Sequence, residues 1–371
     1  MITSSNGWIE QWADRILEYT DTAPSEIYKL IGISSIAMIL HNKVKIKNIK
    51  YILASHMTIK SYGDKYGWDK VRDLFKKLRV GIKIYDEAHL DFDNICKIDF
   101  VTNTFKTLYL TATPARSDRT EDLIYQASFK MCPKIDLFNK ETDPRTHYMA
   151  ILYNSYPDQK VINKCNNPWK KMFDPNAYCK YIIKNPRFYN MLKIILEEIF
   201  IRGKALIYVG LNEAALIIRS WIIIHYPWLK DEVGIYTSIV DKKTKELEKE
   251  KMIILTTTRS AGAALDIHGL KVTVVLSEIF KSKVLARQSL GRTRDYDTLY
   301  IELVDVGMEV CKYCFTAKQK VFEEYALDTK IIQLDDKDIN ERIKEINKNE
   351  EERLKTINSN TKPIDVIQIK K

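Results

Sequence analysis

The chain lacks the sequence features that mark membrane-spanning and secreted proteins. No stretch approaches the ~20 apolar residues of a membrane span, since the longest candidate, 214–226, is interrupted by Arg219 and His225. The first twelve residues have neither the basic start nor the apolar run of a secretory signal. Six cysteines are scattered along the chain. We therefore expect reduced thiols and a cytoplasmic protein with no membrane partner.

The composition is that of a globular protein with an excess of positive charge. Hydrophobic residues make up 45% of the 371 positions and charged residues 29%, enough apolar material for two buried cores. The formal net charge is +10 and the sequence pI is about 9.0. This excess favours a polyanionic partner, and nucleic acid is the obvious one.

Short apolar runs alternate with segments of helical spacing, which predicts an α/β fold with parallel sheets. The predicted strands are 51–54, 81–85, 107–110, 205–209, 252–255, 272–276 and 299–304. Phe188, Leu192, Ile195 and Ile199 share one face of a predicted helix, and a second helix follows Asn212.

The alternating pattern occurs twice, which divides the chain into two lobes. We expect the first lobe at 1–135, a linker or insertion at 136–185, and the second lobe at 186–308. Residues 309–371 are expected to form a helical extension and a charged, solvated tail that frays into disorder.

An acidic tetrad, Asp86-Glu87-Ala88-His89, directly follows the predicted strand at 81–85. Ligands of open α/β sheets bind at the carboxyl ends of strands, so these side chains are expected to line a ligand site. Asp86 can hold Mg²⁺ through water, because that ion keeps much of its hydration shell. The neighbouring Glu87 can orient and polarise an attacking water. An acidic turn is the alternative interpretation of the tetrad alone.

A segment of small hydroxyl residues, Thr111-Ala112-Thr113-Pro114, ends the next predicted strand. Hydroxyls at a strand end can bond to the carboxylates and to His89 without crowding them. Such a segment is common in turns and means little by itself. Its position one strand after the tetrad makes the combination specific.

Together, the tetrad and the Thr-Ala-Thr segment resemble those of DEAH-type superfamily 2 helicases of phages and large DNA viruses. The resemblance covers roughly residues 1–310. It implies two RecA-like lobes, ATP and Mg²⁺ as cofactors, DNA or RNA as partner, and a host-cytoplasmic location for a phage or viral protein. It also implies that Asp86, Glu87 and His89 are catalytic, and that the Thr-Ala-Thr segment couples hydrolysis to nucleic-acid movement.

The resemblance implies further site residues in the second lobe. Gln288 begins a Gln-x-x-Gly-Arg match in which Arg292 would reach the γ-phosphate and neutralise charge that develops in the transition state. The family's second arginine stands at the place held here by Asp295, so the catalytic role of Arg294 is open. Nucleotide and backbone contacts are expected from Gly262, Asp266, Gly291 and Thr257.

Hydroxyl-bearing residues at strand ends of the first lobe are the expected nucleic-acid contacts. Such groups bind phosphate oxygens without reading sequence. The candidates are Thr3, Ser4, Ser5, Ser55, His56, Thr58, Thr111 and Thr113. Helix caps and turn hydroxyls are the alternative interpretation of each.

The family's phosphate-binding loop should precede Thr3, but no Gly-x-x-x-x-Gly-Lys-Ser/Thr sequence occurs anywhere in the chain. Backbone N–H groups and the lysine of that loop normally hold the β- and γ-phosphates. We therefore expect an N-terminally truncated first lobe whose loop comes from an upstream segment or polypeptide. A split gene and a longer reading frame are both consistent with this expectation. The alternative is an ATP-dead nucleic-acid-binding module derived from a helicase.

Two minor features allow a functional and a structural interpretation. Cys311 and Cys314 could be half of a zinc site, but no second Cys/His pair follows at suitable spacing, so packing is favoured. Trp169, with Lys170 and Lys171, could stack on a base and hold phosphates, or could belong to an ordinary anchored loop.

Overall fold

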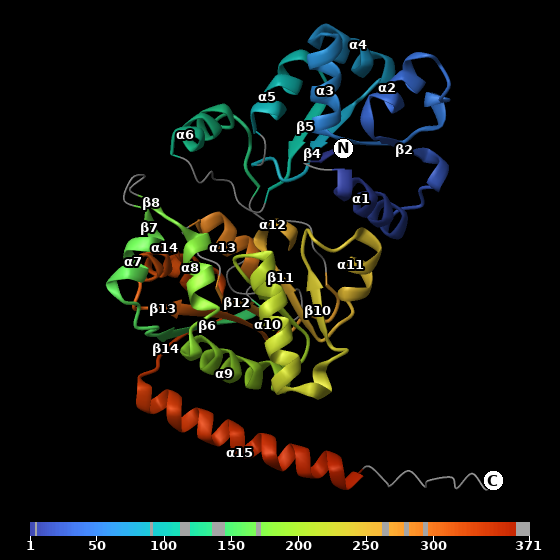
Figure 1. The fold of residues 1–371 in the computed structure, drawn as a ribbon. Helices are drawn as coiled ribbons and strands as arrows, with labels where there is room; N and C mark the ends of the chain where they lie inside the picture. The colour runs from blue at the N-terminus through green and yellow to red at the C-terminus, as the bar shows by residue number, and fades with distance from the viewer. Residues whose placement is uncertain are drawn as a thin grey trace, which may run out of the picture. The chain divides into compact units, whose positions relative to one another are not determined.

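A computed structural model of the chain describes residues 1–3, 6–89, 92–111, 119–135, 145–167, 172–261, 267–277, 282–291 and 296–360. The chain forms two compact units, residues 1–135 and 136–371, and each is built around a parallel sheet (Figure 1). None of the described helices is long and apolar enough to span a membrane.

The first unit holds a five-stranded parallel sheet in the order β2-β3-β1-β4-β5. Its strands are β1 (Ile2–Thr3), β2 (Ile27–Leu30), β3 (Tyr51–Ser55), β4 (Ile82–Tyr85) and β5 (Lys106–Tyr109). Its α-helices are α1 (Asn6–Tyr19), α2 (Gly32–Leu40), α3 (His56–Tyr66), α4 (Trp68–Leu78), α5 (Phe92–Val101) and α6 (Arg119–Ser128). The strands predicted at 51–54, 81–85 and 107–110 are confirmed as β3, β4 and β5.

The two faces of the first sheet are covered unequally. Ile9 and Ile16 of α1 pack with Leu53 of β3 on one face. On the other face, Ile2 and Tyr85 belong to a larger core with α2, α3, α4 and α5. Figure 1 shows α1 on one side of this sheet and those four helices on the other.

The second unit holds a seven-stranded parallel sheet in the order β10-β11-β9-β12-β13-β6-β14. Its strands are β6 (Thr146–Tyr153), β9 (Ala205–Tyr208), β10 (Val233–Tyr236), β11 (Ile253–Thr256), β12 (Val272–Val275), β13 (Thr298–Asp305) and β14 (Thr329–Gln333). A separate antiparallel pair joins β7 (Asn166–Asn167) to β8 (Met172–Phe173). The helices are α7 (Gln159–Cys165), α8 (Pro175–Ile182), α9 (Pro186–Arg202), α10 (Asn212–His225), α11 (Lys242–Glu248), α12 (Thr258–Ala261), α13 (Lys283–Leu290), α14 (Glu309–Tyr325) and α15 (Asp336–Asn360).

The predicted helix with Phe188 and Ile195 on one face is confirmed as α9, and both side chains are fully buried. Its start follows from local chemistry, because the side chain of Asn185 accepts a hydrogen bond from the backbone N–H of Arg187 and Pro186 occupies the first turn. The helix predicted after Asn212 is α10. The four strands predicted in the second lobe are also present.

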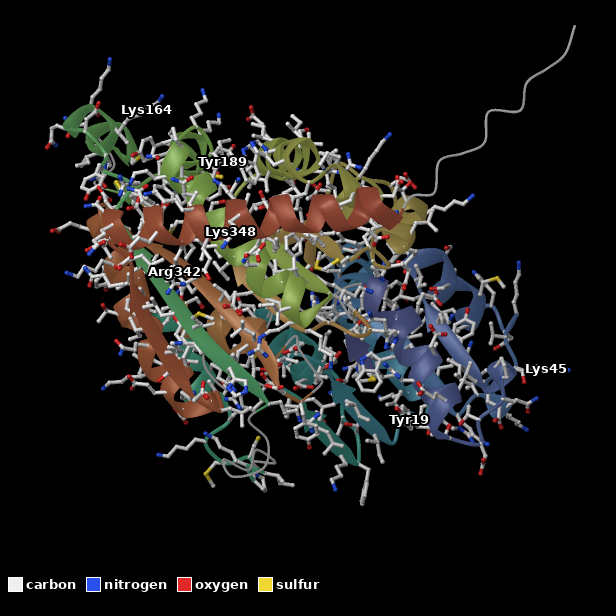
Figure 2. All side chains as sticks on the ribbon, turned by 90° about the horizontal axis from the view of Figure 1, so that it is seen from below. Tyr19, Lys45, Lys164, Tyr189, Arg342 and Lys348 are labelled. Atoms are coloured by element: carbon white, nitrogen blue, oxygen red, sulfur yellow. The ribbon has the colours of Figure 1, made fainter. Side chains whose placement is uncertain are left out.

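Two segments of the second unit differ from expectation. Residues 136–185 were expected to be a linker or insertion, but β6 lies inside the sheet, between β13 and β14, with Tyr148 and Tyr153 buried. The charged run forms α15, which was predicted as a solvated helix. One apolar face of α15 packs on the hydrophobic core of the second unit through Ile339 and Ile346. Arg342 of the same helix is exposed (Figure 2).

Candidate nucleotide site

The acidic tetrad lies at the carboxyl end of β4, as the sequence predicts. Two backbone hydrogen bonds fix its path. The N–H of Asp86 donates to the carbonyl of Ile2 at 3.0 Å, and the N–H of Ala88 donates to the carbonyl of Leu110 at 2.9 Å. The tetrad is therefore held between the ends of β1 and β5, at the sheet edge where ligands of this architecture bind.

Glu87 adopts the left-handed backbone conformation, with a φ of 50°. This region is uncommon for residues other than glycine and costs free energy that the surrounding structure must supply. Ala88, which follows, is fully buried and bonded to the β5 end. Strain held at a strand end beside a carboxylate is typical of a functional turn.

Asp86 accepts a hydrogen bond from the indole N–H of Trp12 on α1, with an Nε1–Oδ2 distance of 2.8 Å. Burial raises the pKa of Asp86 above its usual range, and the negative charge of Glu87 adds to this effect. The Trp12 donor acts in the opposite direction and favours the ionised carboxylate. Trp12 thus orients the carboxylate in this structure.

His89 connects the tetrad to the end of the next strand. Its Nδ1 lies 2.9 Å from Oγ1 of Thr111 and 3.2 Å from Oε2 of Glu87. The imidazole is buried, with 4% of its side chain exposed. The contact expected between the tetrad and the first threonine of the Thr-Ala-Thr segment is therefore present, while Thr113 lies outside the described residues.

The Oε2 atom of Glu87 is buried and accepts no hydrogen bond from any residue within the described part of the chain. Its 3.2 Å approach to His89 brings the two groups close without hydrogen-bond geometry. Buried carboxylate oxygens are normally paired, so an oxygen without a donor points to a ligand, a cation or water. Asp86 and Glu87 supply the hard oxygen atoms that Mg²⁺ prefers.

A buried polar network joins β4 and β5 to α5, and the one sequence feature that could have indicated it is a lysine inside a strand. The ammonium of Lys83 pairs with Asp99 of α5 and donates to Oγ1 of Thr102 at 2.8 Å. The hydroxyls of Tyr85 and Tyr109 also donate to Asp99, at 2.8 and 2.6 Å. Burial raises the pKa of both tyrosines, so they remain neutral donors. This network ties α5 to the two strands that carry the tetrad and Thr111.

The expected nucleic-acid contacts at the β3 end are buried. Ser55 is the N-cap of α3, since its Oγ accepts from the N–H of Thr58 at 3.2 Å, and it is 1% exposed. His56 and Thr58 are also buried, and Thr3 lies within β1 with no exposed surface. Ser55 therefore caps α3, and the nucleic-acid role of these residues stays a prediction. Ser4 and Ser5 lie outside the described residues.

In the second unit, Thr257 is the most fully described of the predicted site residues. Thr257 lies between the end of β11 and the start of α12. Its Oγ1 accepts a hydrogen bond from the backbone N–H of Ser260 at 3.3 Å. Gly291 is exposed directly after α13, and Gln288 lies within that helix. Gly262, Asp266, Arg292 and Arg294 lie outside the described residues.

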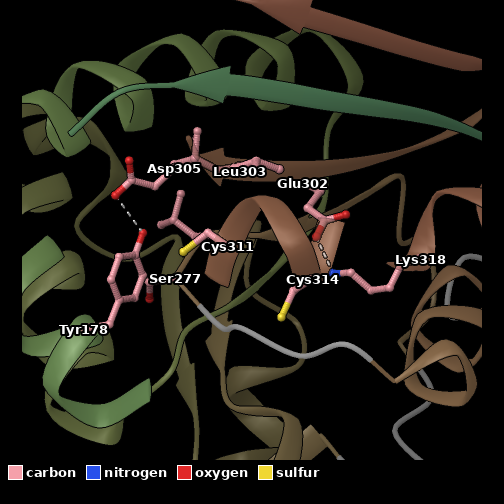
Figure 3. A pocket seen from close by; sticks show the side chains of 10 residues that line it. Tyr178, Ser277, Glu302, Leu303, Asp305, Cys311, Cys314 and Lys318 are labelled. Atoms are coloured by element: carbon pink, nitrogen blue, oxygen red, sulfur yellow. Dashed lines mark hydrogen bonds and ion pairs between the residues drawn. The ribbon is translucent and has the colours of Figure 1, made fainter. Parts of the chain in front are cut away.

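The two cysteines of the Cys-x-x-Cys motif line a small cavity at the ends of β12 and β13 (Figure 3). Cys311 and Cys314 are buried on α14 and line this cavity beside Asp305, whose carboxylate accepts from the hydroxyl of Ser155 at 2.6 Å. Burial raises the pKa of the Cys311 thiol, so it is held in its protonated form. Among the described residues, no group of three or more His, Cys, Asp or Glu side chains could hold a metal ion.

Comparisons with known proteins identify the fold. No protein-family model matches the sequence, and no curated protein matches it either. Among solved structures, a fragment described as the HsdR subunit of a type I restriction enzyme from Vibrio vulnificus YJ016 is similar, with a TM-score of 0.54 and 14% identity over 91% of this chain. Mss116p bound to ssRNA and AMP-PNP gives a TM-score of 0.55 and 12% identity over 93%.

The helicase domain of Pyrococcus furiosus Hef is also similar, with a TM-score of 0.50 and 13% identity over 86% of this chain and 89% of its own. The chain spans 57% of the restriction-subunit fragment and 66% of Mss116p. At these identities the likeness establishes architecture alone. The chain thus has an α/β fold of two RecA-like parallel-sheet lobes, the architecture that these solved structures share.

Proposed function

We propose that this chain is the core of an ATP-dependent nucleic-acid helicase or translocase of the DEAH type. In this proposal, ATP hydrolysis at the β4 end drives remodelling of duplex or branched nucleic acid. The phosphate-binding loop comes from a segment outside residues 1–371. A phage or large DNA virus source remains part of the prediction.

The observation that carries the proposal is the arrangement of Glu87. Its carboxylate stands at the carboxyl end of a parallel strand, on a strained turn, with one buried oxygen that lacks a donor within the described residues. Asp86 is beside it, and His89 joins it to the end of β5 through Thr111. Two carboxylates so placed suit metal-nucleotide chemistry.

Each residue has a distinct proposed role. Asp86, oriented by Trp12, would hold Mg²⁺ through water, and the ion when bound would neutralise phosphate charge. Glu87 would orient the attacking water and accept its proton. His89 and Thr111 would transmit the state of the site to the neighbouring strand end. The expected γ-phosphate contact is Arg292, with Gln288 and Arg294 beside it in sequence.

The nucleic-acid part of the proposal depends on charge. The chain carries a formal net charge of +10, so binding should depend on phosphate neutralisation and weaken as salt rises. A solved structure of Mss116p, which has a similar fold, is bound to ssRNA. Backbone contacts carry little sequence information, so both DNA and RNA are candidate substrates.

The decisive experiment compares ATP hydrolysis with and without nucleic acid, using the chain together with the segment that supplies its phosphate loop. We expect DNA or RNA to accelerate hydrolysis, and Glu87→Gln to reduce the rate about 100-fold or more, because it removes the base without changing side-chain size. Glu18→Gln, an exposed position on α1 that pairs with Arg15, is the matched control. Hydrolysis that survives Glu87→Gln would exclude this mechanism.

A further inference from the structure

The outward face of α10 in the second unit is apolar. Ile218 and Ile222 are fully buried and belong to the hydrophobic core of this unit. On the other side of the same helix, Leu216 is 47% exposed, Ile217 36% and Ile224 72%. A helix that is apolar all round is normally buried on every side, so this exposed face indicates an interaction surface.

The exposed positions form one stripe along the helix, which we call the α10 stripe. It consists of Leu216, Ile217, Ser220, Ile223 and Ile224. Successive residues of an α-helix are about 100° apart, so the five positions fall within about 120° of the helix circumference. Ser220 is exposed at the centre of the stripe, and Ile223 is half-buried. None of the five side chains carries a charge, so the apolar surface is continuous around one small hydroxyl.

The other side chains of α10 leave the stripe open. Arg219 turns toward β10, where its Nε donates to the carbonyl of Val233 at 2.9 Å. Trp221 stacks on Tyr189 of α9 and on His225 of its own helix, with ring centroids 4.9 and 4.1 Å apart. Figure 1 shows α9 and α10 on the same face of the second sheet. These contacts fix α10 in place, and binding to a rigid surface loses little conformational entropy.

Helix α14 of the same unit has the outward face that is usual for a helix in water. Cys314 and Phe322 are buried on its inner side, whereas Lys312, Lys320 and Glu323 are exposed. Charged side chains on the outward face are typical of a surface helix. The α10 stripe has leucine and isoleucine in their place, so contact with water does not explain its composition.

The stripe is symmetric about Ser220. Leu216 and Ile224 lie four positions before and after it, and Ile217 and Ile223 lie three positions before and after it. A two-fold contact requires such symmetry, because every residue pair occurs twice with the partners exchanged. Two antiparallel α10 helices that cross at Ser220 would place Leu216 of each copy against Ile224 of the other. A small side chain at the crossing point allows the helices to approach closely.

Charges of opposite sign lie at the two ends of the stripe. Glu213 is exposed in the first turn of α10, and Lys230 is exposed directly after η3 (Pro227–Leu229), which follows the helix. Antiparallel copies bring the acidic end of one stripe toward the basic end of the other, whereas parallel copies bring like charges together. The two helix dipoles also attract each other when the helices are antiparallel. The charges therefore favour an antiparallel second copy.

We propose that two copies of this chain associate through the α10 stripe, with the two-fold axis at Ser220. The contact is separate from the proposed ATPase, because the stripe lies on the second unit and needs neither nucleotide nor nucleic acid. Glu87→Gln should therefore stop ATP hydrolysis and leave the dimer intact. Either result can fail without the other.

Sedimentation velocity of the full chain over a range of concentrations tests the association. We expect a dimer, and we expect Ile224→Asp to raise its dissociation constant about 10-fold or more, since each dimer buries this side chain twice. Leu247→Asp is the matched control, because Leu247 is 64% exposed on α11 of the same unit and lies outside the stripe. Thermal unfolding of both variants checks that they are folded.

Cysteine pairing tests the arrangement without a charged substitution. In a Cys96→Ser background, which removes an exposed thiol, Ser220→Cys should form a disulfide between two copies because the two-fold axis brings this position against itself. A mixture of Leu216→Cys and Ile224→Cys chains should form the mixed disulfide, whereas Leu216→Cys by itself should not. Leu247→Cys measures the rate of random collision.

Several outcomes would overturn the proposal. The first is a chain that stays monomeric up to about 100 μM, a concentration at which even a weak specific dimer is populated. The others are a dimer that Ile224→Asp leaves unchanged and a Ser220→Cys disulfide that forms no faster than that of Leu247→Cys. A photo-crosslinker at Ile224 identifies the occupant. Crosslinks between the α10 peptides of two copies support the proposal, whereas crosslinks to a different polypeptide or within one copy contradict it.

Discussion

Replacement of Thr111 by valine tests whether the β4 and β5 ends act together. Oγ1 of Thr111 lies 2.9 Å from Nδ1 of His89, and the imidazole is 4% exposed. A net hydrogen bond of this kind contributes about 0.5–1.5 kcal/mol. Thr111 is itself half-buried, so water can replace part of the lost interaction. We expect Thr111→Val to lower the unfolding free energy by about 1 kcal/mol.

The functional consequence should be larger than this loss of stability. Valine keeps the shape of threonine but cannot form a hydrogen bond with His89. The end of β5 then loses its connection to Glu87 through His89. We expect basal ATP hydrolysis to remain and its acceleration by nucleic acid to fall toward the basal rate. The assays are urea unfolding of the chain and steady-state hydrolysis by the complete enzyme.

Thr107→Val is the matched control on the same strand. Its hydroxyl lies 3.2 Å from that of Thr104, at the opposite end of β5 from the carboxylates. This variant should keep the acceleration by nucleic acid. If Thr111→Val and Thr107→Val behave alike in both assays, the proposed link between the two strand ends is wrong.

Further predictions concern stability. Lys318→Met should cost about 3–5 kcal/mol in urea unfolding, because it leaves the buried carboxylate of Glu302 without its ion pair; Glu302→Gln in the same chain should restore part of this loss. Asp86→Asn should raise the unfolding free energy at pH 7. Burial raises the pKa of Asp86, so the folded state binds the proton more tightly than the unfolded state. Wild-type stability therefore falls as pH rises through that window, and the gain of the variant should vanish in titrations below about pH 4. Ser55→Ala should cost about 1 kcal/mol through the lost α3 cap, with an unchanged salt dependence of nucleic-acid binding; a smaller salt slope would restore Ser55 as a phosphate contact.

The sequence alone determined the elements with strong local patterns. Runs of β-branched and apolar residues at 81–85 and 205–209 predicted β4 and β9, because such residues favour β-strands. The helical spacing of Phe188, Leu192 and Ile195 predicted α9. The tetrad could be placed at a strand end, since the strand directly precedes it and the turn residues follow in sequence.

Tertiary structure decided what depends on partners distant in sequence. Trp12 bonds to Asp86 across 74 positions, and no local pattern reveals that contact. The prolines and polar residues of 136–185 obscured β6, whose burial comes from pairing with β13 and β14. Ser55 was predicted as a phosphate contact because a hydroxyl at a strand end can either bind phosphate or cap a helix. In the structure, α3 starts directly after Ser55, so its hydroxyl accepts from the N–H of Thr58. Local patterns fix the secondary structure of a segment, but burial and bonding depend on which strands and helices become its neighbours.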